Sequence, residues 1–127
     1  MTERETTEII ARLKTIVDNV PARDKRGNSE TEIEEFYNAI EASEDAFMDV
    51  VDEIPPDDLC LNREFLDQIC RLAIKADGSY VDGEDKCYSH YQERLPFRLY
   101  DRLEWWTIPI PKLLTDEIKR HLPNIRH

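Results

Sequence analysis

Apolar residues recur at every third or fourth position along most of this chain, as they do on the buried face of an α-helix. Two of these stretches open with a capping box, in which a Ser or Thr is followed three residues later by Glu. The boxes are Thr2–Glu5 and Ser29–Glu32. The pattern predicts one helix that ends at Pro21 and a second, of roughly seven turns, that ends at the tandem Pro55–Pro56.

The second half of the chain predicts shorter helices. Apolar positions from Phe65 to Ile74 favour a helix that begins near Asn62 and ends at Gly78, because glycine suits a helix C-terminus. Asp82 can cap a further helix, and Pro96 should break that pattern so that the next turn starts afresh.

The region before the C-terminus has a different character. Residues 107–112 are too rich in proline for a helix, so we expect an extended chain there. Pro111 then suits the first turn of a last helix, which carries Leu114 and Ile118 inward. No stretch alternates convincingly between apolar and polar residues. The predicted fold class is therefore all-α: a single domain over residues 1–127, a bundle of five to six helices with a long acidic second helix.

Charge is distributed unevenly along the chain. The sequence has 28 acidic and 17 basic residues, a net charge of −11. Residues 28–62 contain twelve of the acids and no Lys or Arg, whereas the remaining 16 acids nearly balance the 17 bases. One predicted helix and the loop that follows it therefore carry the whole imbalance.

Helical spacing places many of these acids on one side of the second helix, and we call this set the acidic stripe. Like charges one turn apart repel each other, and no basic residue within the helix relieves that repulsion. The stripe is either a solvated face that favours solubility or a docking surface for a cationic partner. Its members are Glu30, Glu34, Glu41, Asp45, Asp49 and Asp52.

The docking interpretation predicts an acidic helical protein that binds and inhibits a basic protein partner. Its most concrete form is a bacterial immunity protein that masks the active site of a toxin nuclease. An acidic adaptor or a DNA mimic would suit the charge equally well. Trp105 and Trp106 are neighbours and cannot both face the core, so we expect one exposed tryptophan. We choose Trp105 as a further partner-binding residue, because exposed tryptophans are enriched at interfaces.

Several function classes are disfavoured by the composition. Binding of DNA or RNA needs clustered Lys and Arg, which are lacking here. No apolar run approaches the ~20 residues of a membrane span, and the N-terminal residues MTERETTEII do not resemble a signal peptide. We therefore expect a cytoplasmic protein. No phosphate-binding loop or catalytic motif is present, so we predict neither an enzyme nor a cofactor.

Residues 72–91, LAIKADGSYVDGEDKCYSHY, contain two glycines, four acids, a cysteine and a histidine. The simplest interpretation is a turn, in which one helix ends at Gly78 and the next begins at Asp82. An EF-hand does not fit, because its loop needs alternating oxygen ligands before a glycine at the sixth position.

The same turn carries a family resemblance. Ala76, Asp77 and Gly78, followed by Tyr80 and Glu84, resemble the helical hairpin of the tellurite-resistance TerB-like family. Tyr80 stands where that family has an aliphatic residue, and the resemblance covers only this hairpin. It implies an all-helical, metal-responsive protein with acidic metal contacts near Asp77 and Glu84.

The cysteines and histidines allow weaker hypotheses. Cys60, Cys70 and Cys87 show no CxxC spacing, and we interpret them as buried reduced thiols. Cys87 and His90 are spaced to share a metal ion, whose further ligands would come from Cys60, Cys70, His121 or the acids without a recognisable spacing. They could also form a nucleophile pair, but no group that would orient the base is identified. His121 and His127 lie near the end of the last helix and are expected at the surface.

Overall fold

A computed structural model describes residues 1–21, 27–78 and 94–121 of the chain. Within these residues all regular structure is helical, so the predicted all-α class is confirmed. No described helix combines the length and the apolar character needed to cross a membrane. The helices are α1 (Glu3–Asp18), α2 (Glu30–Asp52), α3 (Pro56–Leu61), α4 (Arg63–Gly78), α6 (Leu95–Trp105) and α7 (Lys112–His121).

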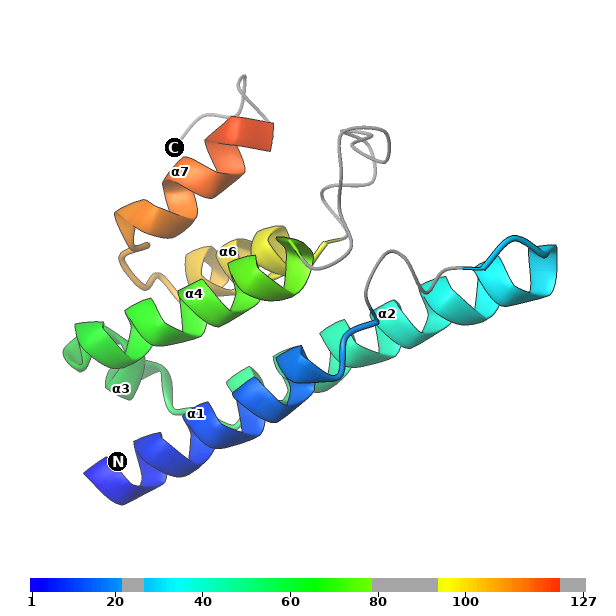
Figure 1. The fold of residues 1–127 in the computed structure, drawn as a ribbon. Helices are drawn as coiled ribbons and strands as arrows, with labels where there is room; N and C mark the ends of the chain where they lie inside the picture. Colours follow the sequence, from blue (N-terminus) through cyan, green and yellow to red (C-terminus); the bar gives the residue numbers. More distant parts are fainter. Residues whose placement is uncertain (22–26, 79–93, 122–127) are drawn as a thin grey trace.

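The helices pack around α4, which contacts α1, α3, α6 and α7 (Figure 1). Helices α1 and α2 lie side by side and run in opposite directions, and α2 also contacts α6. The inward face of α4 includes Leu66, Ile69 and Ala73, which are fully buried against the other helices. Removing this apolar surface from water is the main source of the stability of the bundle.

Both predicted capping boxes are present. Thr2 Oγ1 accepts from the backbone N–H of Glu5 at 3.1 Å, and Ser29 Oγ accepts from that of Glu32 at 3.1 Å. Gly27 precedes the second box with a φ of 78°, which side chains other than glycine rarely adopt. A Cβ on Gly27 would also lie 2.8 Å from Cβ of Glu32, so both the backbone conformation and the close contact favour glycine at the position before α2.

The two halves of α2 are packed differently. Phe47 and Val51 in the C-terminal half belong to the main core. In the N-terminal half, Phe36 and Ile40 form a separate small cluster with Val20, and Tyr37 beside them is 39% exposed. Figure 1 shows this half extending beyond the other described helices. The first turns of α2 therefore form a projection with little packing of its own.

A short helix was missed between the second and third predicted elements. The tandem proline does end α2, but Pro56 is also the first residue of α3, a position that tolerates its missing N–H. Residues 57 and 58 are then acids in the first turn of a helix rather than part of a loop. On α3, Cys60 is exposed, so the expectation of a buried thiol is wrong at this position, whereas Cys70 on α4 is buried as predicted.

Prolines set the limits of the last two helices, as predicted. Pro96 is the second residue of α6, and α7 begins directly after Pro111. Helix α6 ends in a Schellman motif: Ile108 N–H donates to the carbonyl of Leu103, and Thr107 takes the left-handed conformation with a φ of 58°. The predicted helix that starts at Asp82 lies outside the described residues.

Candidate functional site

The C-terminal part of the acidic stripe lies against α6. Arg98 contacts Asp45 at 2.9 Å, and Arg102, one turn later, forms an ion pair with Asp52. These two predicted partner-binding acids are therefore neutralised within the chain by arginines that lie far away in the sequence. Arg102 also lies over the ring of Trp106, 5.5 Å from its centroid, a geometry that favours a cation–π interaction.

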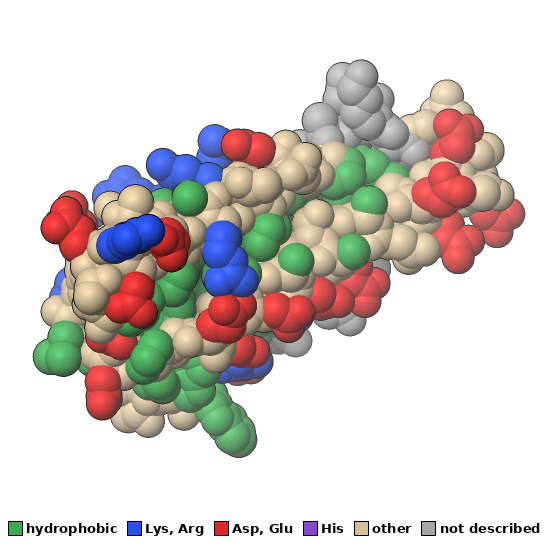
Figure 2. All heavy atoms as spheres, turned by 90° about the horizontal axis from the view of Figure 1, so that it is seen from below, with side chains coloured by type: hydrophobic (Ala, Val, Ile, Leu, Met, Phe, Trp, Pro, Cys, Tyr) green, Lys and Arg blue, Asp and Glu red, His purple; other side chains and the backbone are tan. Residues whose placement is uncertain are grey.

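The remaining members of the stripe have no counter-charge among the described residues, and we call them the bare acids. Glu30, Glu34, Glu41 and Asp49 are exposed and form no ion pair with any residue in the described ranges. In Figure 2 acidic side chains gather at the end of the molecule where α2 begins and continue along one edge. The unpaired charge is thus concentrated on the projecting half of α2, with Asp49 further along.

One of the two tryptophans is exposed, as the sequence predicts. Trp105 is the last residue of α6 and is 82% exposed, whereas Trp106 is only partly exposed. Trp105 lines a surface hollow together with Asp101, Arg102 and Trp106. It therefore lies beside the internally paired part of the stripe, at the opposite end from Glu30 and Glu34.

Glu44 differs from the other acids of α2 because it points inward. Only 7% of it is exposed, and its Oε2 accepts from the backbone N–H of Leu95 at 2.7 Å. The carboxylate thereby caps the first turn of α6, an arrangement that the charge pattern of α2 did not reveal. Burial raises the pKa of Glu44 to about 7, although this hydrogen bond and the positive charge of Arg98 act in the opposite direction.

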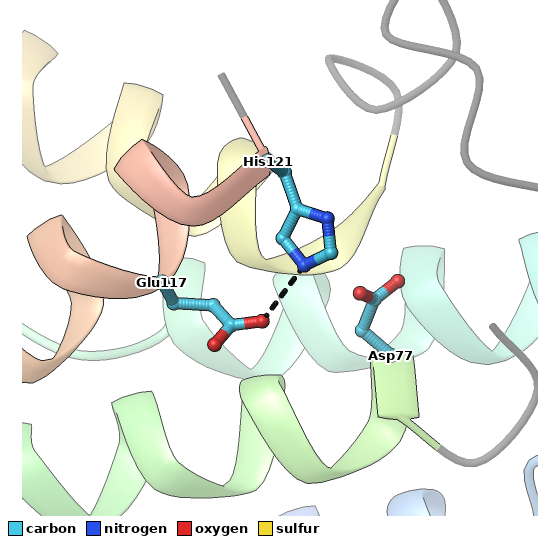
Figure 3. A group of neighbouring side chains, drawn as sticks. All are labelled: Asp77, Glu117 and His121. Atoms are coloured by element: carbon cyan, nitrogen blue, oxygen red, sulfur yellow. Dashed lines mark hydrogen bonds and ion pairs between the residues drawn. The ribbon is translucent and has the colours of Figure 1, made fainter. Parts of the chain in front are cut away.

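Three polar side chains meet between α4 and α7: Asp77 and His121 are buried and Glu117 is partly buried. We call these three residues the buried cluster (Figure 3). Asp77 comes from the end of α4, and the other two lie one turn apart on α7. One ligand atom from each residue lies within 4.8 Å of the others. His121 is only 5% exposed, so its predicted surface position is wrong: it is the helical partner of Glu117, turned toward α4.

The contacts within the buried cluster are polar and uneven. His121 Nε2 lies 3.1 Å from Glu117 Oε1, and the same oxygen accepts from Arg120 at 2.6 Å. Arg94 reaches Asp77 Oδ1 only at 3.5 Å, which is long for a charge-assisted hydrogen bond. Burial raises the pKa of Asp77, and the nearby Arg94 and His121 offset only part of that effect.

Other predicted chemistry has less support or lies elsewhere. Burial raises the pKa of the Cys70 thiol to about 12, so this cysteine is not a reactive thiolate at neutral pH. Cys87, His90 and His127 lie outside the described residues. Glu84 does as well, so its predicted convergence with Asp77 stays a prediction. Asp77 is among the acidic metal contacts that the family resemblance implies, and the spacing of Glu117 and His121, four residues apart on a predicted helix, is the sequence signal for the rest of the buried cluster.

Comparisons with protein families, with curated proteins and with solved structures found no match to this chain.

Proposed function

We propose that this protein is an acidic helical binding protein that docks a basic protein partner. The observation that carries the proposal is the projecting half of α2, where exposed carboxylates have no counter-charge among the described residues. Concentrated charge of one sign accelerates association with a partner of opposite sign and excludes partners of the same sign. The most concrete form is an immunity protein that covers the phosphate-binding surface of a toxin nuclease.

Internal pairing sharpens the choice of docking residues. Asp45 and Asp52 are held by arginines of α6, so they contribute less free charge than their positions on the helix suggest. Within the described ranges, Glu34, Glu41 and Asp49 form no ion pair that a partner would have to break. A stripe kept only for solubility has no reason to group its unpaired members along one edge, since dispersed charges serve that purpose equally well.

A charge-reversal experiment tests this proposal. The triple variant Glu34→Lys, Glu41→Lys, Asp49→Lys reverses bare positions only. A control of equal charge change, Glu8→Lys, Glu64→Lys, Asp116→Lys, reverses three exposed acids on α1, α4 and α7. It also breaks the exposed helical pairs of Glu8 with Arg4 and Asp116 with Lys112, which contribute little to stability. Both variants change the net charge equally, so any difference between them reports the location of charge rather than its total.

The proteins are used to recover a partner from native extract at low and high salt, and the partner is then produced separately for titration. We expect a basic partner whose affinity falls at least tenfold for the α2 variant, stays near wild type for the control and weakens as salt increases. Inhibition of nuclease activity by the wild type, lost in the α2 variant, would support the immunity form. Equal affinity of the two variants would disprove docking through α2.

A further inference from the structure

The buried cluster goes beyond partner docking, because it combines the donors that transition-metal sites use. We infer that Asp77, Glu117 and His121 form a binding site for a divalent transition-metal ion of the Zn²⁺ or Mn²⁺ type, which links α4 to α7. The inference rests on the side chains of these three residues and is independent of the acidic stripe on α2.

The separations between the donor atoms fit one shared ion. Ligands that lie 2.0–2.2 Å from a common ion are at most about 4.4 Å apart, and the three donor atoms already lie within 4.8 Å of one another. His121 Nε2 and Glu117 Oε1 are 3.1 Å apart, as two adjacent ligands of one ion are. Tetrahedral ligands at these metal distances are about 3.4 Å apart, so binding draws the more separated donors together by up to about 1.4 Å, which side-chain rotations supply without a rearrangement of helices.

The local framework holds the donors in place. Glu117 and His121 are separated by four residues on α7, so both project from the same side of the helix. Figure 3 shows the carboxyl group of Asp77 facing the imidazole of His121 from the end of α4. Asp77 and His121 are more than nine-tenths buried, so these donors are already desolvated and their side chains already ordered before an ion arrives.

Two arginines approach the cluster and must be accommodated. Arg94 reaches Asp77 Oδ1 at 3.5 Å, and Arg120 is a mostly exposed side chain that reaches Glu117 from the surface. Arg120 shares Glu117 Oε1 with His121, so an ion bound by this oxygen takes the place of the exposed Arg120 contact, which contributes little to stability. The buried carboxyl of Glu44 also contributes to the electrostatic environment of Asp77. Arg98 in turn acts on Glu44, so three carboxyl groups lie near three guanidinium groups, and an ion binds by displacing the exposed Arg120 from Glu117.

The mixed donor set selects the class of ion. One imidazole nitrogen and two carboxylate oxygens suit Zn²⁺, Mn²⁺ and related ions, whereas Ca²⁺ requires six to eight oxygen ligands and Mg²⁺ favours oxygen alone. Three protein ligands also leave at least one coordination position open to water or another ligand.

The test is a calorimetric titration of the chelator-treated full chain with ZnCl₂ and, separately, MnCl₂. We expect one equivalent to bind, and the melting temperature to rise with metal concentration. Loss of a residue that only orients a metal ligand weakens metal sites about 10–100-fold. Removal of a ligand itself, in Glu117→Gln or His121→Gln, should therefore weaken binding at least tenfold. Glu41→Gln and His90→Gln are the controls, and both should bind as the wild type does.

Manganese gives a second measurement that is free of binding to cysteine, because Mn²⁺ favours oxygen and nitrogen ligands over thiolates. Mn²⁺ broadens the NMR signals of nearby nuclei, and we expect selective broadening of the His121 ring, assigned by its absence in His121→Gln. The broadening is measured on the folded wild type, and the variant serves only to assign the signal. Zinc binding that is lost in His90→Gln but kept in His121→Gln, or an absence of binding by both ions at millimolar concentration, would overturn the inference.

Discussion

The acidic face of α2 and the carboxyl groups buried near it place the same residue types under opposite physical conditions. Glu41 is exposed and unpaired among the described residues, whereas Glu44, one turn further along, is 7% exposed and bonded to the backbone of α6. In water a carboxylate remains charged at little cost, so a bare acid affects recognition far more than stability. In the interior the same group must find a partner or bind a proton.

That contrast assigns different roles to the two regions. The exposed acids determine which charges approach the molecule, and their removal should leave the fold intact. The buried acids join helices. Glu44 links α2 to α6, and Asp77 at the end of α4 contacts Arg94 and lies beside Glu117 and His121 of α7. Changes of pH should therefore act through the interior, and changes of salt concentration through the surface.

The largest expected effect is the pH dependence of stability caused by Glu44. Its pKa is about 7 in the folded chain and near 4.5 when unfolded, so the folded state binds more protons between these values. The contribution of Glu44 to the free energy of unfolding should therefore be fully present below pH 4.5. It should fall by on the order of 3 kcal/mol as the pH rises to about 7. Urea unfolding across this pH range measures the slope.

Glu44→Gln isolates that contribution. The amide oxygen still accepts from Leu95 N–H, but it has no proton to lose. We expect this variant to have a flatter pH profile and to be more stable than the wild type at pH 8. The groups that surround Glu44, namely Arg94, Arg98 and Asp77, are unchanged in it. Glu41→Gln is the exposed control and should keep the wild-type slope; a wild-type slope in Glu44→Gln would contradict the assignment.

A moderate effect is expected from reversing the paired and the bare acids separately. Asp45→Lys with Asp52→Lys breaks two ion pairs and places lysines beside Arg98 and Arg102. This double variant should lose about 1–2 kcal/mol of unfolding free energy, because each exposed pair contributes up to about 1 kcal/mol and repulsion is added.

Glu34→Lys with Glu41→Lys is the matched double variant on bare positions. It should stay within about 0.5 kcal/mol of the wild type, as surface substitutions generally do. Chemical denaturation at low salt compares the two, and high salt should reduce the difference. If both double variants are equally destabilised, the distinction between paired and bare acids is wrong.

The helices themselves were predictable because their signals are local. Thr2 and Ser29 form their capping boxes within four residues of chain, and Pro96 and Pro111 act on neighbouring backbone. Short α3 was missed because the same proline pair that ends one helix also permits the next. Periodicity does not distinguish a proline that stops a helix from one that restarts it.

The sites were less predictable because they depend on packing between distant segments. The spacing of the acidic stripe is visible in the sequence, but its neutralisation by Arg98 and Arg102 depends on the placement of α6 beside α2. His121 was expected at the surface because a histidine near a helix end usually is exposed. Its burial follows from the position of α4 across from α7, which no pattern within α7 specifies.

The smallest expected effect tests whether the bare charges are kept for stability or for recognition. Asn38 is exposed on α2, four residues after Glu34 and three before Glu41. Asn38→Lys should form helical ion pairs with both acids and raise the unfolding free energy by about 0.3–0.5 kcal/mol per pair at low salt. Thermal unfolding at several salt concentrations measures this gain, which should disappear as the salt concentration rises.

The same variant should bind a basic partner less well, because the added lysine lowers the charge that attracts it. Gln68→Lys, at an exposed position of α4 four residues after Glu64, adds equal charge away from the stripe and should leave binding unchanged. A chain that gains stability from Asn38→Lys yet loses affinity would explain why α2 carries no lysine: its charge is selected for a partner at a small cost in stability. A gain in stability with no loss of affinity would leave solubility as the sufficient explanation of the stripe.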